Sequence, residues 1–189
     1  MIYRNAIIED IPAISELQKK YHVSTISEED KKDGFVTTLF AEDQFKELIE
    51  KENGIALACD GARIAAYAMA ASWEYWSKWP LFQHMIQDLA HTQYKGQTLS
   101  VENSYQYGPV CVDKDYRGTE VLPRLFAFSA EQMGKRYPIL ITFINHINPR
   151  SYEAHTRKLG LDVIKSFDFN NNRYYELGYD TSNYFKAAE

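Results

Sequence analysis

Cysteine is scarce in this chain of 189 residues, which contains only Cys59 and Cys111. Both lie in apolar, strand-like stretches, and neither has a second cysteine or a pair of histidines at the spacing of a zinc site. Two isolated cysteines argue against a disulfide framework and are typical of a reducing compartment. We therefore expect a cytoplasmic protein without a metal ion.

Basic clusters and long apolar runs are lacking as well. The 21 Lys and Arg residues against 26 Asp and Glu residues give a net charge of −5, whereas binding to a phosphate backbone needs a concentrated basic surface. The most apolar stretch, residues 55–72, is interrupted by Asp60 and Arg63, and no basic region followed by an apolar one opens the chain. We expect neither a nucleic acid nor a membrane as the partner, and no secretory signal.

What the chain does have is the composition of a globular domain. Hydrophobic residues make up 45% and charged residues 25%, so a core can form without disulfides. The periodicity of apolar residues predicts the order β-α-α-β-β-β-α-β-α-β-β in a single domain over residues 1–189. That order favours an α/β fold with one mixed sheet and helices on both faces. The predicted strands cover residues 3–8, 54–59, 64–72, 101–112, 138–145, 161–167 and 173–179, and the predicted helices begin near Asp10, Ala41, Thr119 and Asn148. Asp60-Gly61 and the run of three asparagines at residues 170–172 predict turns between the strands that flank them.

The clearest chemical signal is the stretch over residues 110–118, where a strand runs through a short turn into a helix. The unpaired N–H groups at a helix N-terminus and the helix dipole together form an anion site. Arg117 adds charge, and Gly118 permits close approach of a phosphate. An ordinary strand-to-helix turn with a surface arginine explains the same residues equally well.

This stretch resembles the acetyl-CoA loop of the GNAT superfamily of N-acetyltransferases, whose pattern is Arg/Gln-x-x-Gly-x-Gly/Ala after a Val-x-Val strand. Two further segments resemble a bacterial branch of that superfamily: residues 34–37 (GFVT), and residues 148–151 (NPRS) followed by Ala154-His155 and Leu159-Gly160. The predicted element order matches the superfamily over essentially the whole chain.

The resemblance implies a mostly antiparallel sheet that splays between its fourth and fifth strands. It also implies transfer of an acetyl group from acetyl-CoA to a primary amine of a small molecule or peptide. In that reading, strand backbone pairs with the pantetheine amides, helix N–H groups hold the pyrophosphate, and a second helix touches the pantetheine arm. The implied cofactor residues are Val110, Cys111, Val112, Arg117, Gly118, Thr119, Glu120, Val121, Leu122, Asn148, Ser151 and His155.

Three positions depart from the family pattern. Glu120 and Leu122 occupy the places of Gly and Gly/Ala, and a carboxylate beside a pyrophosphate is unfavourable unless it points away. Gln106 falls where the family often has a glutamate base. These departures support an alternative function, a non-catalytic acyl-CoA-binding module.

Three residues are candidates for proton transfer. Glu102 shares a strand face with Gln106 by period-two spacing, although a surface carboxylate is the simpler reading. His146 follows the next strand and either reaches the site or merely ends that strand. His155 stands near the place where many relatives have a tyrosine that protonates the leaving thiolate, although it also fits a plain surface histidine.

An aromatic insert at about residues 73–100 separates two predicted strands and holds all three tryptophans. Pro80 is well placed to start a helix there. The insert is interpreted in three ways: as a cover over the acceptor entrance, as a helix packed on the sheet edge with tryptophans filling the core, or as the contact of a homodimer.

Overall fold

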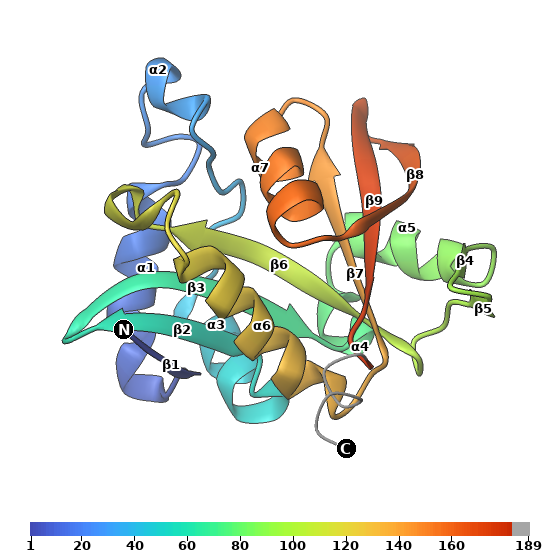
Figure 1. The fold of residues 1–189 in the computed structure, drawn as a ribbon, viewed down its shortest axis with the longest axis horizontal. Coiled ribbons are helices and arrows are strands. Elements are labelled where there is room, and N and C mark those ends of the chain that lie inside the picture. The colour runs from blue at the N-terminus through green and yellow to red at the C-terminus, as the bar shows by residue number, and fades with distance from the viewer. Residues whose placement is uncertain (183–189) are drawn as a thin grey trace. The chain divides into compact units, whose positions relative to one another are not determined.

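The computed structural model describes residues 1–182. Their contacts separate into two compact units: Met1–Ala70 with Gly108–Ser129, and Ala71–Tyr107 with the chain from Ala130 onwards. The main sheet has the strand order β1-β2-β3-β6-β7-β9-β8, and β6 (Ser104–Val112) runs from the second unit into the first (Figure 1). The mixed α/β fold predicted from the sequence is therefore confirmed. The single-domain expectation stays a prediction.

The first unit is built on an antiparallel hairpin of β2 (Ile55–Asp60) and β3 (Arg63–Ala71), with β1 (Ile2–Asn5) paired to β2. Gly61 adopts φ +59° in the hairpin turn, a conformation that glycine reaches without steric cost. β2 and β3 are buried almost throughout, which is typical of strands covered on both faces.

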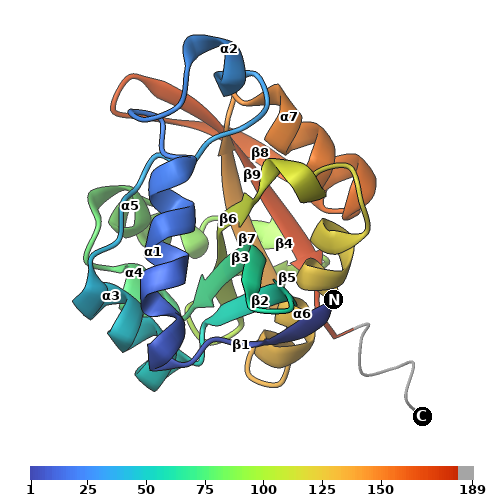
Figure 2. The ribbon, with the colours of Figure 1, turned by 90° about the vertical axis from the view of Figure 1, so that its left-hand side faces the viewer.

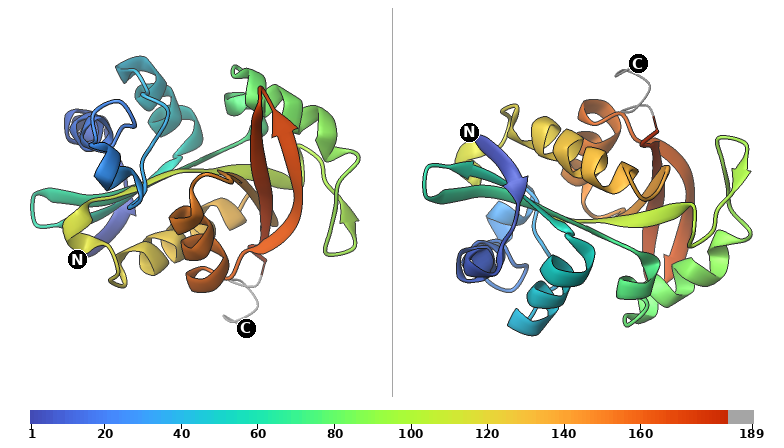
Figure 3. Two further views of the ribbon diagram at one scale, coloured as in Figure 1. Left: turned by 90° about the horizontal axis from the view of Figure 1, so that it is seen from above. Right: turned by 90° about the horizontal axis from the view of Figure 1, so that it is seen from below.

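Helices cover both faces of this hairpin (Figure 3). α1 (Ile11–Lys20) lies on one face, and the first half of α6 (Val121–Gly134) lies on the other. A short helix, α2 (Glu28–Lys31), lies in the loop that follows α1 (Figure 2). α3 (Glu42–Glu47) continues as a π-helical turn, η2 (Leu48–Glu52).

Asp10 precedes α1 as predicted, but its carboxylate does not cap that helix. It accepts hydrogen bonds from the backbone N–H of Ile7 and from Arg4, and so stabilises the 3-10 turn η1 (Ile8–Asp10) instead.

The second unit contains β7 (Ile139–Asn145), β9 (Asn172–Asp180) and β8 (Asp162–Phe169), which are joined by antiparallel pairing. β7 pairs in parallel with the start of β6 over three positions, Ser104 to Gln106. Asn170 and Asn171 both have positive φ, which makes the tight hairpin turn that the run of three asparagines predicted. α7 (Pro149–Glu153), its π-helical continuation η4 (Ala154–Lys158) and the helix α5 (Pro80–Leu89) lie on opposite sides of β8 and β9 (Figure 3).

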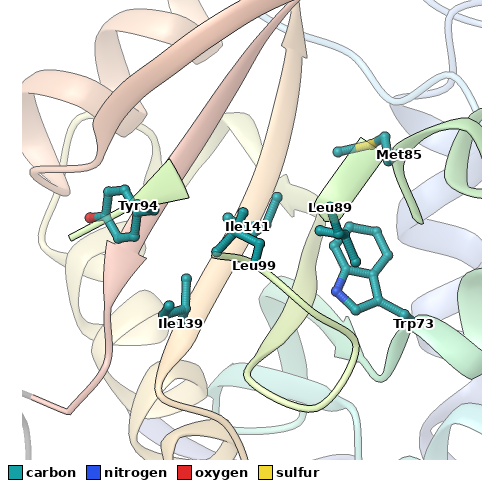
Figure 4. Packing of buried hydrophobic residues seen from close by; sticks show 7 residues of the cluster. All are labelled: Trp73, Met85, Leu89, Tyr94, Leu99, Ile139 and Ile141. Carbon is teal, nitrogen blue, oxygen red and sulfur yellow. The ribbon is translucent and has the colours of Figure 1, made fainter. Parts of the chain in front are cut away.

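The aromatic insert forms part of the core of the second unit. It consists of α4 (Trp73–Trp76), α5 and a small hairpin of β4 (Gln93–Tyr94) and β5 (Gln97–Thr98). Trp73 and Trp76 are fully buried, and their indole N–H groups donate to the Ser104 hydroxyl and the Gln106 carbonyl. Figure 4 shows the cluster that results, made of Trp73, Met85, Leu89, Tyr94, Leu99, Ile139 and Ile141. The core-filling interpretation is thus confirmed for Trp73 and Trp76, while a role at the acceptor entrance or between two copies stays a prediction.

One predicted strand start is wrong. β6 begins at Ser104, because residues 100–103 fold into a turn in which the Ser100 hydroxyl accepts from the N–H groups of Glu102 and Asn103. Serine and asparagine side chains compete with strand pairing in this way. Glu102 is therefore exposed and off the strand.

No helix in residues 1–182 has both the length and the apolar character required to cross a lipid bilayer.

Candidate functional site

The turn between β6 and α6, in the first unit, is held by Asp113. Its carboxylate accepts from the Asp115 N–H and forms ion pairs with Lys20 at 2.9 Å and Arg63 at 3.0 Å. Burial by itself would raise the pKa of Asp113, but the two cations outweigh burial and lower the pKa to about 2. The ionised carboxylate thus joins α1, β3 and the turn through η3 (Lys114–Tyr116).

The backbone of this turn is open to an anion. Gly118, with φ +81°, Thr119 and Glu120 precede α6, and no group in residues 1–182 accepts a hydrogen bond from their N–H groups. The Thr119 hydroxyl accepts from the Val121 N–H at 3.3 Å and donates to the Tyr116 carbonyl at 2.6 Å. Unpaired N–H groups just before a helix are the donors that bind phosphates in proteins.

Arg117 does not project freely beside these donors. Its guanidinium donates to the Val112 carbonyl at 2.9 Å and the Asp33 carbonyl at 2.6 Å, and it lies 4.7 Å from the centre of the Tyr21 ring. In this structure the side chain therefore braces the turn, so any binding of an anion here depends on backbone donors.

Glu120 is exposed. The pKa of Tyr3 is raised mainly by burial, while the positive charge of Arg124 lowers it and the negative charge of Glu120 raises it. The Glu120 carboxylate therefore lies within electrostatic range of β1. Leu122 is partly buried, and Pro123 removes one N–H from the first turn of α6.

Cys111 and the valines beside it lie at the end of β6. Burial raises the pKa of the Cys111 thiol to about 12, which makes it unreactive near neutral pH. Val110 and Val112 are partly buried. Within residues 1–182, no group of three or more His, Cys, Asp or Glu side chains could hold a metal ion.

In the second unit, Asn148 caps α7 by accepting from the Ser151 N–H at 3.2 Å. The helix then widens: the Leu159 N–H bonds to the Ala154 carbonyl, five residues back. A π turn of this kind accommodates one extra residue within a helix.

His155 is buried in the second unit, so the reading of a plain surface histidine is wrong. Its Nδ1 lies 2.8 Å from the Ser151 carbonyl, which requires the proton on Nδ1 and leaves the Nε2 lone pair available. Burial lowers the pKa of His155 despite that hydrogen bond. A neutral imidazole of this tautomer accepts a proton at Nε2 more readily than it donates one.

His146 is held on the same side of the sheet as α7. Its ring stacks on Tyr175 at 3.7 Å, and its Nε2 lies 3.2 Å from the Ser166 hydroxyl. Both contacts are with side chains of β8 and β9, and a part for His146 in proton transfer stays a prediction.

Gln106, which stands where the resemblance places a base, is 1% exposed. Its amide donates to the Tyr107 carbonyl at 2.6 Å, and no donor within residues 1–182 reaches its Oε1.

Two features of the site were missed by sequence reasoning. Glu176 is buried in β9, which pairs with a strand on each side. The sequence feature that could have indicated this burial is a single carboxylate between Tyr175 and Leu177 in a predicted strand. Gly108-Pro109 lies inside β6, where Pro109 has no N–H to donate to a neighbouring strand.

Comparison with known proteins finds no matching family model and no matching curated protein. Solved structures do match. The protein yncA from Salmonella typhimurium, solved with its cofactor acetyl-CoA, superposes with a TM-score of 0.62 at 12% identity, covering 95% of this chain and 93% of that one. A ribosomal-protein-alanine N-acetyltransferase from Brucella melitensis gives 0.60 at 16%, covering 95% and 99%.

A GNAT-family acetyltransferase from Listeria monocytogenes gives a TM-score of 0.60 at 15% identity, covering 95% of this chain and 94% of that one. These matches extend over nearly the full length of both chains, so the arrangement of elements is shared although the sequence identity is low. This chain has the fold of the GNAT acetyltransferases.

Proposed function

We propose that this protein transfers an acetyl group from acetyl-CoA to a primary amine. The observation that carries the proposal is the row of N–H groups without acceptors at Gly118, Thr119 and Glu120, in a chain with the fold of acetyltransferases. Three unpaired donors just before a helix suit a pyrophosphate.

The other cofactor contacts follow the same proposal. The backbone of β6 near Val110 and Val112 pairs with the pantetheine amides, as an added strand would. Asn148 and Ser151 contact the pantetheine arm. The chemistry then requires a neutral amine, a polarised thioester carbonyl and a proton for the departing thiolate. Because one matching structure is named for acting on ribosomal-protein alanine, a peptide α-amine is included among the candidate acceptors.

Two measurements test this function. Calorimetry should detect acetyl-CoA binding in the micromolar to millimolar range, and release of free thiol should depend on an added primary amine. Absence of binding at millimolar acetyl-CoA would contradict the proposal. Binding without thiol release over a broad panel of amines would instead favour a non-catalytic acyl-CoA-binding module, for which Gln106 in place of a glutamate is the supporting observation.

Glu120 provides a sharper test of the phosphate site. Its carboxylate is exposed beside the open N–H groups, so Glu120→Gln should tighten acetyl-CoA binding about threefold, since a charge near a helix N-terminus is worth about 0.3–1 kcal/mol. Calorimetry at low salt measures the change, and added salt should reduce it.

Glu131→Gln is the matched control, because Glu131 is exposed near the other end of the same helix α6. It should leave the affinity unchanged. Equal affinities for the wild type and both variants at low salt would show that the cofactor's phosphates do not bind at this turn.

A further inference from the structure

Strand β9 of the second unit carries a buried carboxylate, that of Glu176. Glu176 pairs with Phe143 of β7 on one side and with Lys165 of β8 on the other. Directly opposite residues of antiparallel strands point to the same face, and Phe143 contacts Phe82 of α5, with ring centroids 5.6 Å apart. Glu176 therefore lies on the face that α5 covers, which we call the α5 face.

The Glu176 carboxylate has few partners. The residue is 4% exposed, and its nearest cation is the Lys165 ammonium at 3.9 Å. That ammonium already donates to the Asp88 carboxylate and, at 2.7 Å, to the Thr92 hydroxyl. No hydrogen bond within residues 1–182 reaches the carboxylate of Glu176. Because buried carboxylates normally have hydrogen-bond donors, this arrangement suits a group that exchanges a proton with a ligand.

A second oxygen acceptor on this face, the side-chain Oε1 of Gln106, is buried as well. Gln106 pairs with Ile141, and Ile141 pairs with Gly178, so the Gln106 side chain lies on the α5 face one row before Glu176. Its Oε1 is buried with no donor in the described residues. An unpaired buried acceptor is destabilising, and an N–H group of a ligand would remove that cost.

A series of aromatic rings lies on the same α5 face. Trp76, Phe82, Phe143, Tyr174 and Phe167 form a continuous series with centroid separations of 4.9, 5.6, 5.5 and 5.3 Å. All except Trp76 are partly exposed. Aromatic faces attract cations, so the combination of ring faces with two oxygen acceptors suits an ammonium group better than a neutral or anionic ligand.

We propose that Glu176 is the proton acceptor of the acyl transfer and that, with Gln106 and the ring of Phe143, it selects a cationic primary amine as the acceptor. This inference rests on the proposed function. The ammonium gives one proton to the Glu176 carboxylate, and the neutral nitrogen attacks the thioester carbonyl carbon. The C–S bond breaks, the thiolate takes the second proton from nitrogen, and Glu176 later releases its proton to water.

The charged and titratable groups that face Glu176 define the expected pH dependence. They are Lys165 on β8, and Asp88 and His84 on α5. Burial raises the pKa of Glu176 to about 7, an effect that Lys165 opposes and Asp88 reinforces. Since the ionised form accepts the proton, kcat/KM should rise as pH increases through about 7.

The test compares wild type with Glu176→Gln, which keeps the shape of the side chain and removes its basicity. Thiol release is followed with an arylalkylamine, a polyamine and a peptide with a free N-terminus. We expect a loss of about 100-fold in kcat/KM and loss of the inflection near pH 7, because positioned proton acceptors contribute about 10²–10⁴-fold. Glu176→Asp should retain part of the activity. Acetyl-CoA affinity and melting temperature should stay close to wild type, which separates a catalytic loss from unfolding.

Glu74→Gln is the matched control, because it makes the same change at an exposed carboxylate on α4 and should leave kcat/KM unchanged.

Asp88→Asn should move the inflection to lower pH, since it removes the negative charge that raises the pKa of Glu176. An isosteric alcohol of the best amine should bind far more weakly than the amine. If the wild type turns over an amine and Glu176→Gln retains its rate and pH profile, this inference alone fails. If the wild type binds acetyl-CoA but acetylates no amine, the proposed function fails and the inference with it.

Discussion

Replacing Gly54 by alanine should cost about 3 kcal/mol of stability, at the upper end of the range for overpacking. A Cβ atom at position 54 would lie 2.2 Å from the backbone carbonyl oxygen of Ala70 and 3.0 Å from the Leu48 side chain. A backbone carbonyl cannot rotate away as a side chain can, and the Gly54 carbonyl also accepts from the Ala70 N–H at 2.8 Å. The strand end must therefore shift. Urea unfolding followed by circular dichroism measures the loss as a lower midpoint with an unchanged slope.

Gly61→Asn is the control for this prediction. Gly61 is in the turn of the same hairpin, at φ +59°, with nothing within 4 Å of an added Cβ. Asparagine tolerates this conformation better than other residues with a side chain, so its cost should stay near 1 kcal/mol. Similar midpoints for the two variants would mean that the strand end accommodates the methyl group and that the predicted clash is absent.

The second large effect is expected at Asp113, where Asp113→Asn should destabilise the protein by about 2 kcal/mol at neutral pH. The change removes the charge with which Lys20 and Arg63 pair, at a buried carboxylate whose ion pairs are screened less than those on the surface. The turn that carries the open N–H groups is fixed by this carboxylate, so acetyl-CoA affinity should fall as well. Thermal unfolding and calorimetry measure the two losses.

The pH dependence of this effect has a definite sign. The pKa of Asp113 is lowered to about 2 in the folded protein, while the unfolded chain has the ordinary value near 4. Its contribution is fully present above the unfolded pKa and is lost as pH falls through the folded one. Wild type and Asp113→Asn should thus differ above about pH 4 and converge toward pH 2. Asp115→Asn, at a side chain 56% exposed that also pairs with Arg63, should cost less than about 1 kcal/mol. A difference between wild type and Asp113→Asn that stays constant from pH 7 to pH 2 would refute this account.

The proposed activity assigns different tasks to the two faces of the sheet in the second unit. The α7 side holds His146 and the buried, neutral His155, whereas the α5 face holds Gln106 and Glu176. His155 in its Nδ1–H tautomer is poorly suited to protonate a thiolate, since it has no proton at Nε2. In the proposed mechanism, Glu176 therefore accepts the proton from the ammonium, and the thiolate takes its proton from the attacking nitrogen.

Local patterns predicted most of the elements because each pattern fixes its own backbone. The period of two identified β2 and β3, and Asp60-Gly61 marked the turn between them. The three asparagines marked the β8–β9 turn, and Pro80 the start of α5. A predicted strand boundary was wrong where side chains compete with backbone pairing, as those of Ser100 and Asn103 do before β6.

The candidate site was predicted less completely, since spacing in the sequence does not report partners. The sequence predicts the strand, turn and helix over residues 112–121. It does not predict that Arg117 donates to the Asp33 carbonyl, because these residues are 84 positions apart. The aromatic insert was recognised as unusual. Only burial decided that Trp73 and Trp76 fill a core rather than stand at a surface.

The sequence by itself determined the order of the elements, the strand-to-helix turn with its glycine at position 118, and the scarcity of reactive or metal-binding cysteine, because these depend on residues close together in the chain. The tertiary structure alone decided which groups have partners. Asp113 became a buried ion-pair centre because α1 and β3 bring Lys20 and Arg63 to it. Glu176 and Gln106 became buried acceptors on one face because β7 places their strands in register. Burial and pairing set the free energy of a charge, and both arise only when distant segments pack together.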